Sequence, residues 1–312
     1  MKWLSFSVRY LVNVEDLNNV ESAGNYVRHR RAPIVIKENG TYVVTYAPAV
    51  SGEMIAHGYQ MNLVEIALQR KLPVEDLAKQ GVLLKRGAGD KVHTTKCSDK
   101  NGSDYELCVI EEDVVEDVAG FMNPEKLVKR TSNIAFSYMV PALDAVKASA
   151  IASQFQVRYA TKELIDKYKN ENIQSLYNVE TASASYVLTG YLNLDGVGVT
   201  QNYPVKSAND KSEREKAALD ALVLTLTQFL FGAKRTRYNP LVEIEALAVA
   251  LSEKPFNLPP INGGVNEYIK LVESTAESFS KALGVKKPKI AFYAKGVEGS
   301  ESNPVEVFNK VK

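Results

Sequence analysis

Hydrophobic and polar residues alternate along the first segment of the chain, residues 3–13. Leu4, Phe6 and Val8 lie on one side of the strand, and Ser5, Ser7 and Arg9 lie on the other. A period of two predicts a β-strand with one buried face. Three further core strands are expected over residues 131–141, 178–194 and 239–251.

Two longer segments repeat their apolar residues with the period of a helix. Residues 51–72 begin at Ser51, which is suited to cap a helix, and carry Tyr59 and Leu63 in an apolar stripe. Residues 211–231 carry a stripe of leucines, and Gly232 follows at a position that suits a C-terminal turn. We therefore expect both segments to be amphipathic helices with one buried face.

The six segments follow one another as strand, helix, strand, strand, helix, strand. This order is typical of an α+β fold with a ferredoxin-like, RNA-recognition-motif-like core: a four-stranded antiparallel sheet, two helices on one face and a free opposite face. We expect residues 1–312 to form a single elaborated domain. The other segments are then large insertions and a C-terminal helical region, which span residues 14–50, 73–130, 142–177 and 262–312.

The first insertion contains a predicted β-hairpin. Two short apolar segments, residues 34–37 and 41–46, are joined through Asn39 and Gly40. An Asn-Gly pair readily adopts positive φ, as a tight hairpin turn requires.

The composition is that of a soluble globular protein, with 45% hydrophobic and 24% charged residues. A formal net charge of +1 excludes a generally basic nucleic-acid-binding protein. The sequence contains no apolar segment long enough for a membrane span, and its N-terminus alternates where a signal peptide would be continuously apolar, so we expect a cytoplasmic protein without a membrane partner. Cys97 and Cys108 are too few for a disulfide scaffold; they could form a bridge, but the residue pattern favours free thiols.

Positive charge is concentrated in three short clusters. The first follows Asn25 and comprises Arg28, His29, Arg30 and Arg31; the second contains Lys126, Lys129 and Arg130, with Thr131 beside it; the third contains Lys234, Arg235 and Arg237. Any one of these clusters alone is more often a solvated surface than a binding site. Together with the exposed amides expected at Ser51 and Gly52, where a helix begins, they predict a surface that holds phosphates.

The signals for other chemistry are weak. Glu53 and His57 share a helix face but lack a third metal ligand, and the acidic run over residues 111–117 is more often a solvated face than a cation site. The chain contains no catalytic motif, and we expect no enzyme activity, no metal and no cofactor. Phe121 and Met122 form either a core anchor or an exposed wedge that enters between bases. The aromatic strand motif of sequence-reading RNA-recognition domains is missing, so any bound RNA is held through its backbone rather than read by its bases.

Five stretches of the chain resemble a known family: NVEDLNNVESAGNYVRHRRAP (13–33), SGEMIAHGYQ (51–60), GFMNPEKLVKRTSNI (120–134), QFQVRY (154–159) and GAKRTRYNP (232–240). They are similar to the repeating backbone subunit of type I CRISPR surveillance (Cascade) complexes, and the archaeal I-A branch looks nearest. The resemblance covers nearly the full chain in the same order.

The resemblance implies a non-catalytic scaffold whose copies stack along the CRISPR guide RNA and present it for pairing with a target DNA strand. The implied partners are the guide RNA, the target DNA, further copies of the chain and other subunits of the complex. One position departs from the pattern, because relatives can carry a histidine where Gln156 stands. The implied RNA-binding residues are Asn25, Arg28, His29, Arg30, Ser51, Gly52, Arg130, Thr131, Lys234, Arg235 and Arg237.

Two other functions remain open from the residues. A metal-dependent RNA-processing nuclease of ferredoxin-like fold would need a cluster of carboxylates or histidines. A sequence-reading RNA regulator would need aromatic residues on its central strands.

Overall fold

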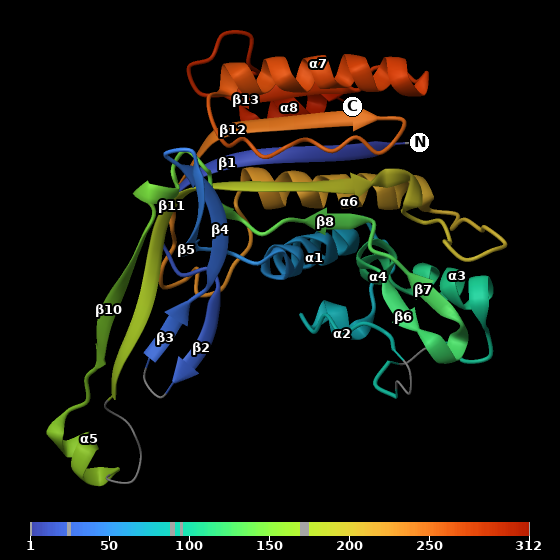
Figure 1. Ribbon diagram of the computed structural model, residues 1–312. Helices are drawn as coiled ribbons and strands as arrows, with labels where there is room; N and C mark the ends of the chain where they lie inside the picture. Colours follow the sequence, from blue (N-terminus) through green and yellow to red (C-terminus); the bar gives the residue numbers. More distant parts are fainter. Residues whose placement is uncertain (1, 24–25, 88–90, 94–95, 169–174, 312) are drawn as a thin grey trace.

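One large sheet runs through the molecule, and the long helices α1 (Gly52–Gln69), α6 (Lys211–Thr227) and α7 (Val265–Leu283) lie against it (Figure 1). The computed structural model describes residues 2–23, 26–87, 91–93, 96–168 and 175–311. The fold is a mixed α+β fold. Within the described residues, three short 3-10 helices also occur: η1 (Pro124–Lys126), η2 (Val146–Ala148) and η3 (Leu194–Gly196).

The centre of the sheet is antiparallel. β1 (Trp3–Glu15) lies between β11 (Ser175–Asn193) and β12 (Leu241–Ser252) and pairs antiparallel with both. Two short strands, β8 (Ile134–Phe136) and β9 (Val140–Pro141), pair antiparallel with β11 on its far side. On the far side of β12, β13 (Lys289–Ala294) pairs antiparallel with β12.

Three helices cover one face of the sheet: α1 (Gly52–Gln69), α6 (Lys211–Thr227) and α8 (Pro304–Val311). Their apolar residues join those of β1 in one buried core. α1 and α6 pack closely: the hydroxyl of Tyr59 donates a hydrogen bond to the carbonyl of Ala218 at 3.0 Å. Gly58 allows close approach of the segment after α6, since a Cβ there would lie 2.5 Å from the Cβ of Phe231.

The opposite face is not free, which corrects the expectation of an open sheet. α7 (Val265–Leu283) covers its β12–β13 end and buries Tyr268, Val272 and Ala276 against the alanines of β12. The reason is the apolar stripe of α7, which requires a buried partner surface. The C-terminal region, expected to be helical, also contributes the edge strand β13.

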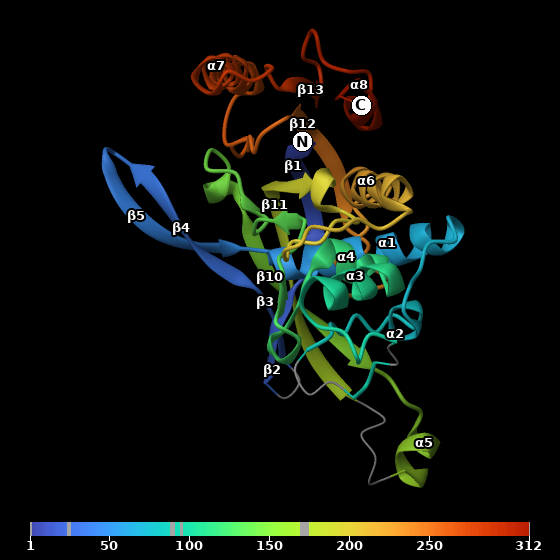
Figure 2. The ribbon, with the colours of Figure 1, turned by 90° about the vertical axis from the view of Figure 1, so that its right-hand side faces the viewer.

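The first insertion forms two strand pairs: β2 (Asn19–Ala23) with β3 (Tyr26–His29), and β4 (Arg31–Glu38) with β5 (Thr41–Pro48). The predicted hairpin is confirmed in the second pair, where Asn39 and Gly40 have φ values of +48° and +84°. β3 also pairs with β11, in parallel. The β4–β5 hairpin projects from the body of the molecule (Figure 2).

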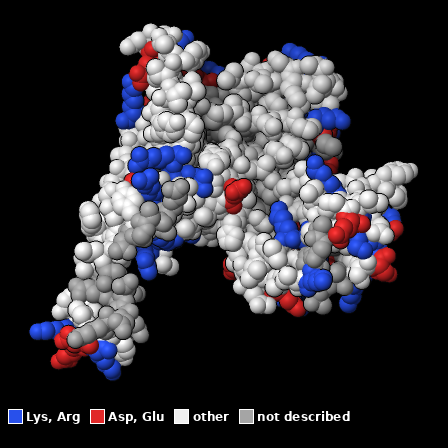
Figure 3. Space-filling view, turned by 60° about the horizontal axis from the view of Figure 1, so that its bottom comes forward, with Lys and Arg blue, Asp and Glu red and all other residues white. Residues whose placement is uncertain are grey.

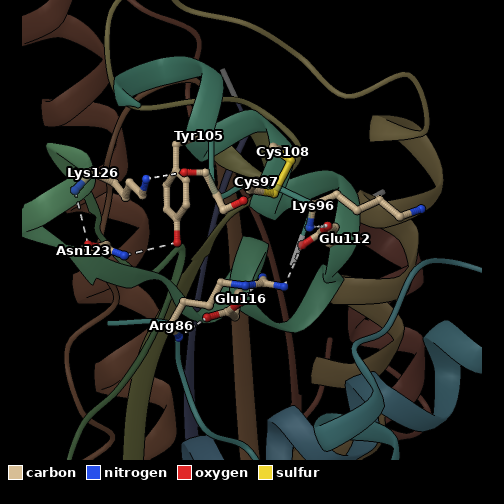
Figure 4. Close-up of a disulfide and its surroundings, with 10 residues drawn as sticks. Arg86, Lys96, Cys97, Tyr105, Cys108, Glu112, Glu116, Asn123 and Lys126 are labelled. Carbon is tan, nitrogen blue, oxygen red and sulfur yellow. Dashed lines mark hydrogen bonds and ion pairs between the residues drawn. A yellow bond between two sulfur atoms is a disulfide. The ribbon is translucent and has the colours of Figure 1, made fainter. Parts of the chain in front are cut away.

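The second insertion has a small core of its own, and we call it the cysteine lobe (residues 73–130). Its elements are α2 (Asp76–Lys79), α3 (Gly102–Glu112), α4 (Val114–Ala119), β6 (Phe121–Asn123) and β7 (Val128–Arg130). Cys97 and Cys108 form a disulfide, so the preference for free thiols was wrong (Figure 4). The chain before α3 folds back along that helix and places the two Cα atoms 5.8 Å apart, an approach that residue spacing alone does not reveal.

The acidic run of the cysteine lobe is largely buried, which corrects the expectation of a solvated face. Asp113 caps α4 by accepting from the amides of Val115 and Glu116. Asp117 pairs with Arg130 at 2.5 Å and with Arg214 at 3.2 Å, so it ties the lobe to α6. Carboxylates of Glu75, Asp113 and Glu116 lie close enough together to share a cation, but both oxygens of Glu116 accept from Arg86.

The third insertion is an arm built on the long strand β11. β10 (Ala150–Arg158) pairs along the outer part of β11, and α5 (Lys162–Lys167) lies at the tip, far from the sheet (Figure 1). The arm exposes large apolar side chains, including Phe155 and Tyr159.

Candidate nucleic-acid interface

Residues 15–18, at the end of β1, form a junction between segments that are distant in sequence. The register between β1 and β11 shifts between Val12 and Glu15, and Val14 has a φ of +55°. The chain therefore leaves the regular strand here, as expected at a β-bulge. The residues of this junction segment (residues 15–18) contact the first basic cluster, the third basic cluster and the beginning of α1.

Asn18 joins the first basic cluster to the beginning of α1. Its Oδ1 accepts hydrogen bonds from Nε of Arg30 at 2.9 Å and from the amide of Ser51 at 2.8 Å. Ser51 is buried, and its hydroxyl accepts from the amide of Met54 at 3.3 Å as the N-cap of α1. A Cβ at Gly52 would lie 2.4 Å from the carbonyl oxygen of Phe136, so the helix begins tightly against β8. Ser51 and Gly52 thus fix the position of the helix N-terminus. The expectation of an exposed amide at Ser51 is wrong, because that amide is buried and bonded to Asn18.

Glu15 holds His29 in the interior. His29 Nε2 lies 2.7 Å from Oε1 of Glu15, and both side chains are fully buried. The same Oε1 accepts from the hydroxyl of Tyr186 at 2.7 Å, and Oε2 accepts from the amide of Leu17 at 2.8 Å. Burial alone would lower the pKa of His29, but the interaction with Glu15 outweighs it and raises this pKa above its usual range.

Asp16 and Leu17 bring the third basic cluster to the same place. Lys234 Nζ lies 3.3 Å from Oδ2 of Asp16, and the amide of Ala233 donates to the carbonyl of Leu17 at 2.8 Å. Gly232 has a φ of +99°, and a Cβ there would lie 2.4 Å from the side chain of Leu17. Burial raises the pKa of Asp16, although the charge of Lys234 acts in the opposite direction.

The remaining residues of the third cluster lie nearer to solvent. Arg235 is half-buried and Arg237 is exposed. Gln156, on the arm, lies next to the side chain of Tyr238. The third cluster therefore borders both the junction segment and the arm.

An open pocket of about 510 Å³ lies beside the junction segment. Glu180 organises its wall: the carboxylate accepts from the hydroxyl of Tyr26 at 2.8 Å and from the amide of His29 at 2.9 Å, and it pairs with Arg31 at 3.2 Å. Burial alone would raise the pKa of Glu180, but these donors outweigh it and lower that pKa. The pocket is lined by Val20, Tyr26, Arg28, His29, Arg31 and Glu180.

Two cations face solvent at this pocket. Arg28 is exposed, with its guanidinium carbon 5.7 Å from the ring centre of Tyr26, and about half of the Arg31 side chain is exposed. In Figure 3, Lys and Arg side chains gather at the base of the arm. A further group lies on the cysteine lobe, across a hollow from the first. This geometry presents guanidinium groups that an anion can reach.

The second basic cluster is not brought to this pocket. Arg130 is buried in the cysteine lobe, where its guanidinium binds Glu106 at 2.8 Å, Asp117 and the carbonyls of Val199 and Gly196. All of these acceptors belong to the protein, so the geometry gives Arg130 a packing role and leaves no surface on it for a phosphate. Thr131 is exposed, and its backbone exchanges two hydrogen bonds with the side chain of Gln201.

The two remaining candidates divide between core and surface. Phe121 is buried in the core of the cysteine lobe, whereas Met122 is 57% exposed. Asn25 lies outside the described residues.

The acceptors that organise the interface were not singled out from the sequence. Glu15, Asp16 and Asn18 come directly after the first predicted strand, and Glu180 lies within the third. Acidic residues close in sequence to a basic cluster are a weak signal by themselves, because only the fold brings Glu180 to His29.

Comparison with known proteins identifies the class of this chain. The family model described as "CRISPR-associated negative auto-regulator DevR/Csa2" matches residues 6–273. The protein "CRISPR-associated protein Cas7/Csa2 1" of Saccharolobus solfataricus is 74% identical over 98% of this chain and 96% of its own length. A second protein of that organism, "CRISPR-associated aCascade subunit Cas7/Csa2 2", is 36% identical over 90% of this chain and 88% of its own.

The chain therefore belongs to the DevR/Csa2 family of CRISPR-associated proteins, which confirms the resemblance found in the sequence. Among solved structures, a chain of a "CRISPR RNA-guided surveillance complex" aligns with a TM-score of 0.49 and 9% identity over 98% of this chain and 97% of that one. Across the described part of the chain, the helices are too short or too polar to cross a membrane.

Proposed function

We propose that this protein is a backbone subunit of a CRISPR surveillance complex that binds the guide RNA through its phosphates. Membership of the DevR/Csa2 family supports the assembly, since one relative is named as an aCascade subunit. The observation that carries the RNA-binding role is the convergence, on residues 15–18, of the first and third basic clusters and the N-terminus of α1.

The cations of the interface divide into two sets. Arg28, Arg31 and Arg237 face solvent and contact phosphates directly, with Arg235 beside them. Forked guanidinium groups match phosphate geometry. His29, Arg30 and Lys234 are held by Glu15, Asn18 and Asp16, respectively, and position the backbone that carries the first set.

The binding is nearly indifferent to RNA sequence. The cations of the pocket act on phosphates, which carry no sequence information. A scaffold with this property accepts guides of many sequences, and copies of the chain line up along one RNA and present it for pairing with a target DNA strand. The protein acts in the cytoplasm and is not an enzyme.

The centre of the fold is proposed to be a ferredoxin-like, RNA-recognition-motif-like core. The antiparallel neighbours β12, β1, β11 and β8, with α1 and α6 on one face, support this assignment. Because these strands and helices share one core, we also propose a single elaborated domain in which the remaining segments are insertions.

Co-purification tests the proposed function. Expressed together with a CRISPR array, the protein is expected to carry heterogeneous small RNAs that share repeat-derived ends. Substitution of Arg28 and Arg31 by glutamate removes this RNA, whereas Lys286→Glu, at an exposed lysine in the loop before β13, retains it. Protein free of RNA, or equal RNA content in both variants, contradicts the proposal.

A further inference from the structure

The β4–β5 hairpin has one buried face and one exposed face. Ile34, Ile36 and Ala47 point inward and pack with Val146 in a small core. The apolar and aromatic side chains that face solvent from the outward positions are Pro33, Val35, Tyr42, Val44 and Tyr46. Val35 and Val44 lie opposite each other, and the exposed fractions of Tyr42 and Tyr46 are both 71%.

The outward face is an ordered ladder. Pro33 pairs with Tyr46, Val35 with Val44, and Lys37 with Tyr42. Both tyrosines lie on one strand, four residues apart, which places them about 13 Å from each other. An exposed row of this kind is unusual on a monomer and marks a surface that binds something.

The charge of this face favours an anionic partner. Arg31 and Lys37 alternate with Pro33 and Val35 on β4, and Lys37 Nζ lies 5.9 Å from the ring centre of Tyr42. The outward positions of β4 and β5 carry no aspartate or glutamate. Glu38 points to the inner side, where it pairs with Lys147 at 2.9 Å.

The face is also continuous with the candidate phosphate site. Arg31, at the base of the hairpin, lines the pocket that Tyr26 and Arg28 share. From there the ladder leads outward to the tip, along the part of the hairpin that stands clear of the body (Figure 2). Tyr46 is the first aromatic side chain of the ladder beyond Arg31, because it pairs with Pro33, two residues further along β4.

We propose that the outward face of the β4–β5 hairpin is a stacking platform for bases of the guide RNA. Tyr46 and Tyr42 each carry a base, and Lys37 binds a phosphate between or beyond them. Stacking on tyrosine tolerates every base, because each base has a π-face, so the platform adds affinity without adding sequence preference. This inference rests on the proposed function, since it concerns the same RNA.

The test compares two double variants in binding to a guide-length RNA of mixed sequence that contains 2-aminopurine. The double variant Tyr42→Leu/Tyr46→Leu removes both rings, and Tyr42→Phe/Tyr46→Phe keeps them. Each lost ring is expected to weaken binding by about 5- to 150-fold. The leucine variant should lose fluorescence quenching of the 2-aminopurine, and the phenylalanine variant should retain it.

The salt dependence separates this inference from the proposed function. The leucine variant keeps the slope of log affinity against log salt, since no phosphate contact is removed. Tyr203→Leu, at a tyrosine that is 91% exposed elsewhere, serves as the matched control and binds as the parent does.

Three outcomes overturn the inference. Unchanged affinity and quenching in the leucine variant overturn the stacking platform alone, provided that the parent binds RNA with a salt slope. Loss of self-association without RNA, measured by sedimentation and with RNA affinity intact, shows instead that the face docks a second copy. A parent protein that fails to bind RNA overturns both proposals.

Discussion

His29 Nε2 lies 2.7 Å from Oε1 of Glu15, and both side chains are fully excluded from solvent. The basic cluster that gives the sequence its strongest local charge thus places its histidine in the interior. Two arginines next to it, Arg28 and Arg31, remain at the surface. The buried ion pair between His29 and Glu15 fixes the backbone at His29. Because Arg28 and Arg31 lie close to His29 in the chain, the same pair holds both arginines at the pocket.

The stability of the protein is expected to fall as pH rises through the range in which His29 loses its proton. The pKa of His29 is raised in the folded state, because Glu15 stabilises the imidazolium. This contribution is fully present below the unfolded pKa of about 6.5 and is lost as pH rises through the higher folded pKa. Urea unfolding between pH 5.5 and 9 measures it.

The matched variant is His29→Gln, which cannot titrate. It is expected to lack this part of the pH dependence and to be less stable than the parent at pH 6. If the two proteins show the same pH profile, the ion pair with Glu15 does not control it.

Asn18→Ala is expected to destabilise the protein by about 1–3 kcal/mol, because the amide of Ser51 and Nε of Arg30 lose their shared acceptor. RNA affinity should also fall, since Arg30 and the beginning of α1 lose their fixed relation. Chemical denaturation and RNA titration measure the two effects. Asn309→Ala, at an exposed position of α8, is the control and should change neither; an equal effect of both substitutions counts against the junction segment.

Loss of the disulfide is expected to affect stability and not RNA binding. The bridge joins residues eleven apart, and closing a loop of this length contributes about 3 kcal/mol by chain entropy. The variant Cys97→Ser/Cys108→Ser should therefore unfold at lower temperature. Its RNA affinity should match that of the parent, because the pocket at Arg28 contains no residue of the cysteine lobe. A large loss of RNA affinity in a folded variant would contradict this separation.

Shortening the arm is expected to leave the monomer folded but to abolish assembly on RNA. Residues 157–176 can be replaced by an Asn-Gly turn, since Gln156 and Tyr177 are paired across β10 and β11. The pairing of β3 with β11 and the carboxylate of Glu180 remain in place. We expect the arm to act as a thumb that presses between bases, with a cost of a few kcal/mol for unstacking.

Nuclease protection of bound RNA measures this role. The parent should give a regular protection pattern, and the shortened protein should give none while retaining its melting transition. An unchanged pattern would mean that the arm is a surface projection without a role in assembly.

The sequence predicts the elements whose residues repeat regularly. β1 and α1 follow from alternation and from a helical stripe, and the β4–β5 turn follows from Asn39 and Gly40, since each signal is local. The sequence does not predict β13 or the packing of α7 on the sheet. Both depend on contacts between the C-terminal segments and β12, which local patterns do not reveal.

Only the local features of the candidate site, its clusters of positive charge, could be predicted from the sequence. Local charge density indicates that positive residues are concentrated near Arg28 and Lys234, but it does not distinguish a buried cation from an exposed one. Arg130 and His29 have partners far away in sequence, Glu106 and Glu15, and only the folded chain reveals these pairs.

The salt dependence of RNA binding tests the central claim most directly. Each phosphate contact on a single strand contributes about 0.7 to the slope of log affinity against log salt. Arg28→Ala, Arg235→Ala and Arg237→Ala are each expected to lower the slope by about that amount and to weaken guide-length and scrambled RNAs alike, whereas Lys286→Ala leaves the slope unchanged. Strong preference for one sequence over its scrambled form, or a slope that none of the arginine substitutions changes, would contradict the account.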